Sequence, residues 1–197
     1  VSVNKISSID DHHSLNEVVF DNVRVPTANR IGEEGKGWTY AKALLAHERT
    51  SIAAVADSKR KLRELRELLA QEVSGGRPLS EDTQFQNRLS NTEIELMALE
   101  YTELRVLAAT ADGKGPGVES SLLKIKGTEI QQAIQQMYMD LAGYYSGVIH
   151  GEETAETIGH AFGHDARRAY MYGRAATIYG GSNEVQKNIT AKYVLGL

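Results

Sequence analysis

The sequence predicts a mainly α-helical protein, an antiparallel bundle of the four-helix type with a short N-terminal β segment. Apolar residues recur at steps of three and four over three long stretches between residues 38 and 141, which is the pattern of amphipathic helices. Glycine-rich breaks at residues 74–78 and 113–117 separate these stretches, and short connections favour antiparallel neighbours. The first 31 residues instead hold a segment rich in Val and Phe, as strands do.

The N-terminal β segment is expected to be the end of a larger sheet. Its clearest strand signal is residues 17–26 (EVVFDNVRVP), where Asp21 and Asn22 mark a turn or bulge and Pro26 closes the run. Two or three strands do not make a stable sheet alone. We therefore expect residues 1–35 to hold terminal strands of a β-domain and a glycine-rich connector, and residues 36–197 to form the helical bundle.

The long helices follow from their apolar stripes. One helix is predicted over residues 38–73, a second from about Ser80 to Asp112 with Ser80 as its N-cap, and a third over residues 118–141. The residues expected in the core are Ala41, Leu45, Ile52, Val55, Leu62, Leu65 and Leu69 in the first, Phe85, Leu89, Leu96, Leu99 and Leu107 in the second, and Leu122, Ile125, Ile130, Ile134, Met137 and Leu141 in the third.

The C-terminal third is less regular. Residues 143–163 are expected to be irregular and residues 167–176 to form a shorter helix. A turn at residues 179–181 then leads to Ser182, which is suited to cap the last helix.

Composition excludes several classes of partner and site. The formal net charge is -4, which gives no electrostatic reason to expect nucleic acid or a membrane surface as a partner. The basic run at residues 59–66 (KRKLRELR) is interrupted by leucines at helical spacing, so we interpret it as a solvated helix face. Cysteine is absent, and no apolar run approaches the roughly 20 residues of a membrane span.

Glu48 is the candidate catalytic residue that the pattern itself selects. It lies three residues after Leu45 and four before Ile52, on the apolar stripe of the first helix. A buried carboxylate must be paired or its pKa rises, and a raised pKa suits a general base near neutral pH. Two interpretations stay open: a general base, or a structural carboxylate paired with a cation such as Arg49.

The segment of residues 178–186 (IYGGSNEVQ) is a second candidate site. Two glycines permit a tight turn or the close approach of a ligand to the backbone, and Ser182 with Glu184 suits a helix N-terminus. A capped helix and a ligand site both fit this pattern. The histidines form no metal constellation: His160 and His164 are four apart, but the glycines beside them argue against a shared helix.

These segments together resemble the acyl-CoA dehydrogenase family. Residues 17–26, 32–38 (GEEGKGW) and 44–49 (LLAHER) are similar to its passage from the middle β-domain into the C-terminal helical bundle. Residues 178–186 and 191–197 (AKYVLGL) resemble its C-terminus. The resemblance implies a FAD-dependent oxidation of an acyl-CoA thioester to the trans-2-enoyl-CoA, in which a carboxylate removes the α-proton and the β-hydrogen leaves as hydride.

The resemblance also implies roles for individual residues. Many members carry their base directly after the Tyr of the C-terminal motif, where this chain has Gly180; others carry it on the first bundle helix before an Arg, as Glu48 precedes Arg49. Glu48 is thus implied as the general base, and the Gly180 backbone N–H as a donor to the thioester carbonyl. The remaining implied contacts are Ser182, Glu184 and, less closely matched, Arg77 for the cofactor, and Arg49, Tyr179 and Gly181 for the substrate.

The same resemblance implies partners and a location, and the departures from it leave alternative functions open. It implies an acyl-CoA substrate, electron-transferring flavoprotein as electron acceptor, a homotetramer or a heteromer with a related subunit, and a cytoplasmic or, in a eukaryote, mitochondrial-matrix location. Two departures stand out: Arg77-Pro78-Leu79 in place of an Arg-x-x-Phe motif, and residues 140–145 (DLAGYY) in place of Gln-x-x-Gly-Gly. A non-catalytic partner subunit and a cofactor-free helical module are therefore the alternatives. The 197-residue chain alone is expected to be inactive.

Overall fold

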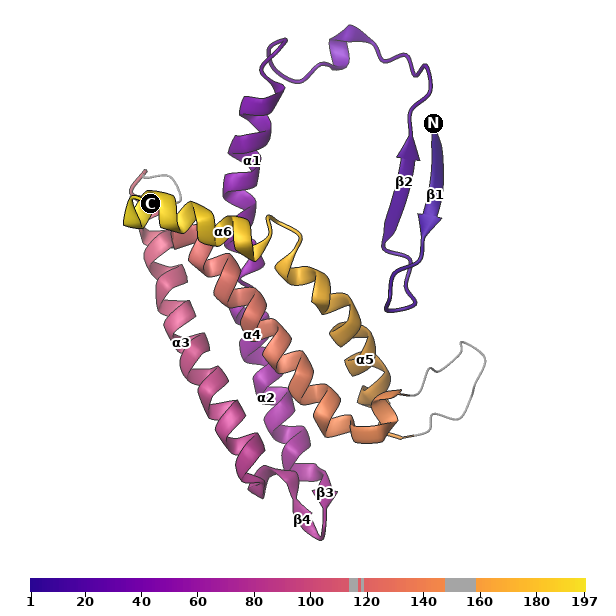
Figure 1. The fold of residues 1–197 in the computed structure, drawn as a ribbon, viewed down its shortest axis with the longest axis vertical. Helices are drawn as coiled ribbons and strands as arrows, with labels where there is room; N and C mark the ends of the chain where they lie inside the picture. The colour runs from indigo at the N-terminus through magenta and orange to yellow at the C-terminus, as the bar shows by residue number, and fades with distance from the viewer. Residues whose placement is uncertain (114–116, 118, 148–158) are drawn as a thin grey trace.

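The computed structural model describes residues 1–113, 117, 119–147 and 159–197, without the side chains of residues 46–51, 161 and 164 (Figure 1). It confirms the mainly α fold. Four helices lie side by side in a bundle: α2 (Val55–Gln71), α3 (Thr83–Ala111), α4 (Glu119–Ala142) and α5 (Ala161–Gly173). Helix α4 is central, since it packs on α1, α2, α3, α5 and α6. Its buried residues include Leu123, Ile130, Ile134 and Met137.

The single helix predicted over residues 38–73 is wrong, because the chain breaks into α1 (Gly37–Ile52) and α2. Ala54 between them has a left-handed backbone (φ 47°). At the break α4 comes close to the chain: a Cβ at Gly127 would stand 2.6 Å from the Ala53 Cα. The Gln131 side-chain amide donates to the Ile52 carbonyl at 2.9 Å. Contact with α4 therefore satisfies a helix end that the local sequence does not signal.

The N-terminus of α3 also differs from the prediction. Asp82, not Ser80, is the N-cap, and its carboxylate accepts from the backbone N–H groups of Gln84 and Phe85. Ser80 lies in the preceding 3-10 turn η2 (Leu79–Glu81). This turn follows a short hairpin whose strands, β3 (Val73–Ser74) and β4 (Arg77–Pro78), have two residues each. A carboxylate suits the N-cap of a helix as well as a hydroxyl does, so the sequence alone is compatible with either residue as the N-cap.

In α3 and α4, two predicted core residues are exposed, Leu107 and Leu122, and their neighbours Val106 and Leu123 are buried in their place. The other predicted stripe residues of α2, α3 and α4 are buried, with Phe85 packed at the edge of the core. Helix α5 begins at Ala161, six residues earlier than predicted, because a buried Gly163 is tolerated inside it. The chain ends in a 3-10 turn η4 (Arg174–Thr177), helix α6 (Asn183–Thr190) and a π-helical turn (Ala191–Leu195).

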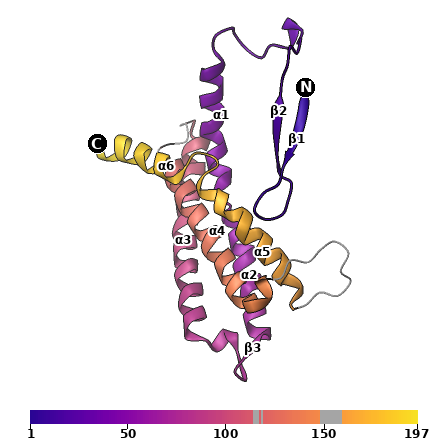
Figure 2. The ribbon, with the colours of Figure 1, turned by 45° about the vertical axis from the view of Figure 1, so that its right-hand side comes forward.

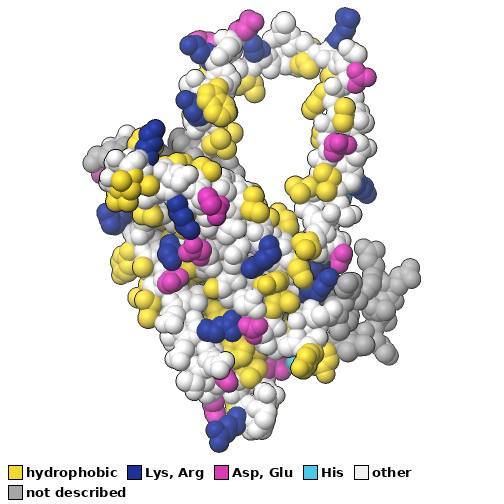
Figure 3. All heavy atoms as spheres, viewed as in Figure 1, with side chains coloured by type: hydrophobic (Ala, Val, Ile, Leu, Met, Phe, Trp, Pro, Cys, Tyr) yellow, Lys and Arg dark blue, Asp and Glu magenta, His cyan; other side chains and the backbone are white. Residues whose placement is uncertain are grey.

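The β segment is an antiparallel hairpin of β1 (Ser2–Ile6) and β2 (Leu15–Val19), with Ser2 opposite Val19. Every residue of both strands is exposed. Figures 1 and 2 show the hairpin standing apart from the bundle beside α1, and Figure 3 shows open space between them. The tip of the hairpin is tied to α5, where buried Arg167 pairs with Asp11 at 3.2 Å. Such a hairpin needs further surface to cover it.

Candidate functional site

The predicted turn and cap at the start of α6 are both present. Gly180 (φ 65°) and Gly181 (φ 87°) have left-handed backbones, which glycine adopts without the steric cost of a Cβ. The Ser182 hydroxyl then accepts from the Val185 N–H at 3.3 Å as the N-cap. The sequence therefore dictates the local shape of this segment.

Gly180 is seated against the end of α1. A Cβ at position 180 would stand 2.3 Å from the Ile52 Cδ1, so only a glycine fits beside that side chain as it is placed. Ile52 is the last residue of α1. The structure thus brings two segments 128 positions apart into contact, which no pattern along the chain could show.

Glu48 lies on α1, one helical turn before Ile52. Residues four apart share a face of an α-helix, so position 48 belongs to the face that Ile52 presents. The side chains of Glu48 and Arg49 lie outside the described residues. On the same stripe, Ala41 is half-buried and Leu45 is 43% exposed, so the outer part of α1 is not core in this chain.

A buried lysine lies beneath the turn, and sequence reasoning missed it. Lys124 of α4 is 0% exposed, and its ammonium donates to the Asn183 Oδ1 at 2.7 Å. Burial lowers the pKa of Lys124, while the nearby Glu184 carboxylate opposes that shift. Thr128, one turn further along α4, exchanges longer contacts of 3.4 Å with the Asn183 amide. The sequence pattern gave no sign of its burial, because its neighbours at helical spacing include Ser121 and Thr128 and are not apolar.

A second pair joins the same two helices. The Ser121 hydroxyl donates to the Gln186 Oε1 at 2.9 Å, and Gln186 is fully buried. The Gln186 Nε2 lies directly beneath Gly181, 2.3 Å from where a Cβ would be. It has no hydrogen-bond partner among the described residues. Polar side chains of α4 and α6 therefore form the floor of the turn.

The other predicted site residues are divided between the two ends of the bundle. Tyr179 next to the turn is 44% exposed, and the burial of the rest of its side chain, followed by the neighbouring Tyr172, raises its pKa. Glu184 is exposed, and its own backbone N–H and the Ser182 hydroxyl hold its pKa low. Arg77 lies in β4, at the opposite end of the bundle from α6 (Figure 1).

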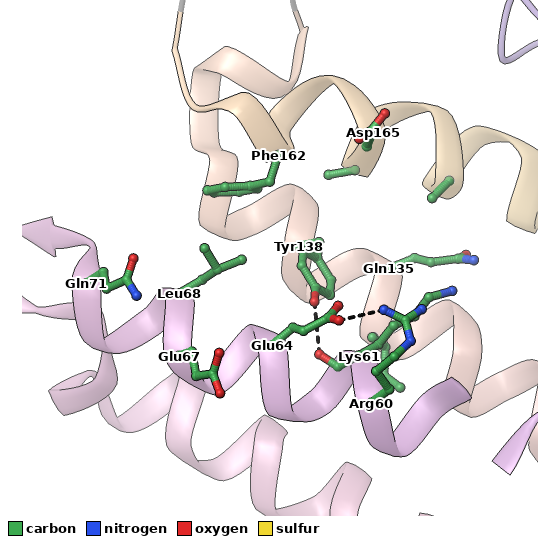
Figure 4. Close-up of a pocket in the computed structure, with 13 residues that line it drawn as sticks. Arg60, Lys61, Glu64, Glu67, Leu68, Gln71, Gln135, Tyr138, Phe162 and Asp165 are labelled. Atoms are coloured by element: carbon green, nitrogen blue, oxygen red, sulfur yellow. Dashed lines mark hydrogen bonds and ion pairs between the residues drawn. The ribbon is translucent and has the colours of Figure 1, made fainter. Parts of the chain in front are cut away.

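A cavity elsewhere in the bundle contains none of these residues. It has a volume of about 560 Å³ and lies between α2, α4 and α5 (Figure 4). The Tyr138 hydroxyl donates there to the Lys61 carbonyl at 2.9 Å, and burial, with the Glu64 carboxylate, raises the Tyr138 pKa to about 12. Arg60 pairs with Glu64 at its rim. Among the described residues, this cavity lies away from the turn at residues 179–181.

The histidines do not form a metal site among the described residues. His160 precedes α5 and pairs with Glu72 at 3.0 Å, whereas the His164 side chain lies outside the described residues. In the described ranges no three metal-ligating side chains gather. No helix in those ranges has the length and apolar character needed to cross a membrane.

The basic run of α2 is a solvated face, as predicted, with Lys59 paired to Glu100.

Comparison with known proteins places this arrangement in a family. The family model described as "Acyl-CoA dehydrogenase, C-terminal domain" matches residues 35–195. The acyl-CoA dehydrogenase IpdE1 of Mycolicibacterium smegmatis is 29% identical over 197 residues, which are 100% of this chain and 46% of that protein.

Two solved structures agree with the sequence comparison. The acyl-CoA dehydrogenase of Geobacillus kaustophilus superposes with a TM-score of 0.80 at 27% identity, over 98% of this chain and 48% of that one. The ChsE4-ChsE5 complex of Mycobacterium tuberculosis gives 0.79 at 27% identity, over 100% and 50%. The chain spans about half the length of the relatives that it matches.

Proposed function

The chain belongs to the acyl-CoA dehydrogenase family, whose C-terminal domain it matches, and from this premise we propose that the protein oxidises an acyl-CoA thioester to the trans-2-enoyl-CoA. The observation that carries the proposal is the contact of Gly180 with Ile52, one helical turn after Glu48. It brings the backbone of the C-terminal turn to the helix face that holds the candidate base. Neither segment could perform the reaction alone.

Two groups of this chain act on the thioester: one accepts its α-proton, and the other stabilises the negative charge that forms. Glu48 accepts the α-proton of the thioester, a general-base step that typically contributes about 10²–10⁴-fold to the rate. Negative charge then moves onto the thioester carbonyl oxygen, and the Gly180 N–H donates a hydrogen bond to it; removing such a donor typically costs about 3–4 kcal/mol. Arg49, Tyr179 and Gly181 would hold the thioester between these groups.

FAD is the cofactor that this proposal requires, and when bound it supplies the acceptor for the β-hydride. The donor and acceptor set at the α6 N-terminus suits part of that group. Ser182 and Glu184 offer a hydroxyl and a carboxylate, which fit N–H and O–H donors and would repel a phosphate. Arg77, at the far end of the bundle, would contact a cofactor only from a neighbouring subunit.

Assembly is part of the proposal. The outer face of α3 exposes large apolar residues at steps of three and four, Ile94, Met97, Tyr101 and Leu104. This is the spacing of a helix–helix seam. We propose a homotetramer, or a heteromer with a related subunit as in the solved ChsE4-ChsE5 complex. Electron-transferring flavoprotein would reoxidise the cofactor, in the bacterial cytoplasm or the mitochondrial matrix.

The test is Glu48→Gln in the full-length protein with any natural partner subunit. Gln keeps the shape and hydrogen bonding of Glu but cannot accept the α-proton, so flavin reduction by a good acyl-CoA should slow by about 10²–10⁴-fold. Flavin content and acyl-CoA affinity should stay near wild type. Glu95→Gln, an exposed carboxylate on α3, is the matched control and should leave the rate unchanged. Reduction at the wild-type rate in Glu48→Gln would make Glu48 a structural carboxylate.

A second candidate, the non-catalytic partner subunit, is favoured by one segment. Where the family carries Gln-x-x-Gly-Gly, Asp140 pairs with Arg88 at 2.6 Å and Tyr144 is fully exposed. If flavin reduction in a heteromer survives Glu48→Gln but stops when the related subunit loses its own base, this candidate replaces the first.

A further inference from the structure

The polar floor beneath the turn has no role in the chemistry described so far. Three residues of α4 at steps of three and four, Ser121, Lys124 and Thr128, meet two residues of α6, Asn183 and Gln186. All five are buried. The contacts join the central helix to the first turn of α6, which begins directly after the two glycines.

We propose that Lys124 is a positioning residue: its buried ammonium holds Asn183, and through it fixes the Gly180–Gly181 turn against α1. The inference rests on the proposed function, since the turn matters for catalysis only if the Gly180 N–H meets the thioester. Lys124 touches no reacting atom in this scheme.

The burial of a lysine needs such an explanation. Removing an ammonium from water is costly, and an apolar side chain of similar volume usually packs as well or better. The lowered pKa of Lys124 reflects that cost. Among the described residues, the ammonium makes its one hydrogen bond with Asn183. Its acceptor lies on α6, so the hydrogen bond links α4 to α6, which an apolar side chain could not do.

The turn also needs an external anchor. Gly180 and Gly181 have more backbone freedom than other residues, so they do not hold a fixed direction for their N–H groups by themselves. A geometric error of about 1 Å in a catalytic group can cost about 100-fold in rate. Asn183 is three residues after Gly180 and is clamped by Lys124 and Thr128. Fixing Asn183 therefore limits the positions that the Gly180–Gly181 turn can adopt.

The experiment compares Lys124→Met with Tyr138→Phe in the full-length protein with any partner. The control removes a half-buried hydrogen bond, from Tyr138 to the Lys61 carbonyl, at a part of α4 away from the turn. We expect Lys124→Met to lower kcat by about 10–100-fold with KM and flavin content little changed. Hydrogen exchange of residues 178–182 should accelerate at least about tenfold, as expected when a local structural restraint is lost. Tyr138→Phe should change neither quantity.

A double-mutant cycle then separates positioning from packing. If Lys124 acts through Asn183, Lys124→Met and Asn183→Leu together should lower kcat no further than the more severe single variant. Independent, multiplying losses would overturn the proposal. Should Lys124→Met fail to fold, Thr128→Val removes only the hydroxyl that contacts Asn183 and should give a smaller loss of the same kind. Unchanged kcat and exchange in Thr128→Val would then overturn the proposal.

The outcomes also separate this inference from the proposed function. Faster exchange at residues 178–182 in Lys124→Met, in a protein whose wild type oxidises no acyl-CoA, supports the anchoring and refutes the dehydrogenase. Wild-type exchange and wild-type kcat in Lys124→Met refute the anchoring and leave the dehydrogenase standing.

Discussion

Replacing Gly180 with alanine should test whether the C-terminal turn is seated on α1. The substitution adds one carbon with two separate effects. It places a Cβ on a backbone with φ 65°, and it puts that Cβ 2.3 Å from the Ile52 Cδ1. The first effect depends on Gly180 alone, and the second depends on the contact with Ile52.

Each of the two effects has an expected cost in stability. A left-handed backbone costs a non-glycine residue about 1–2 kcal/mol, which the lower entropy of the unfolded chain offsets by about 0.4–1 kcal/mol. The contact adds about 0.5–1.5 kcal/mol, because the Ile52 Cδ1 is the end of a flexible side chain that can leave its rotamer. Gly180→Ala should therefore lower the free energy of unfolding by about 0.5–3 kcal/mol.

Gly75→Ala is the matched control. Its φ of 59° is close to that of Gly180, and a Cβ there would meet nothing within 4 Å. It isolates the backbone cost. Denaturant unfolding of both variants should show Gly180→Ala less stable than Gly75→Ala by about 0.5–1.5 kcal/mol, the cost of moving the Ile52 side chain out of its rotamer. In an Ile52→Val background, which lacks the clashing carbon, the difference should vanish.

Equal losses in the two glycine variants would refute the reasoning, since they would show that position 180 has room for a Cβ. A difference that persists at full size in Ile52→Val would also refute it, because the obstruction would then be another group. Either result would separate the turn from α1 and remove the observation on which the proposed function rests.

Two further predictions concern the helices. Ala54→Gly should raise the free energy of unfolding by about 0.5–1 kcal/mol, because φ is 47° there, whereas Ala53→Gly next to it should lower that free energy by at least about 0.5–1 kcal/mol. Denaturant midpoints measure both changes. A loss of stability in Ala54→Gly would contradict the left-handed backbone at that position. Tyr101→Glu with Leu104→Glu on α3 should shift sedimentation to a smaller species with unchanged helicity, because the charges would be buried in the seam; an unchanged assembly moves the interface elsewhere.

The bundle could be predicted because its information is local. The core stripes of α2, α3 and α4 repeat at helical spacing, and most of their members are buried as expected. The Ser182 cap and the two-glycine turn could be predicted for the same reason, since residue type alone favours those backbone shapes. Each of these features depends on residues within a few positions of one another.

The break in the first helix could not be predicted, because its cause is far along the chain. Residues 53 and 54 are both alanine, the residue with the highest helix propensity, and no Gly or Pro marks a stop. The close approach of Gly127 and the hydrogen bond from Gln131 favour the break. Lys124 was missed for a similar reason: a lysine is almost always exposed, and its acceptor lies 59 positions away.

One face of α4 connects the two halves of the candidate site. Lys124 holds Asn183, Gly127 meets Ala53, and Gln131 holds the Ile52 carbonyl, at helix positions three and four apart. Helix α4 therefore positions both the helix that carries the candidate base and the turn that carries the candidate N–H. Any side chain at Gly127 would clash with the Ala53 backbone, and would therefore disturb the contact of Ile52 with Gly180 without touching either one.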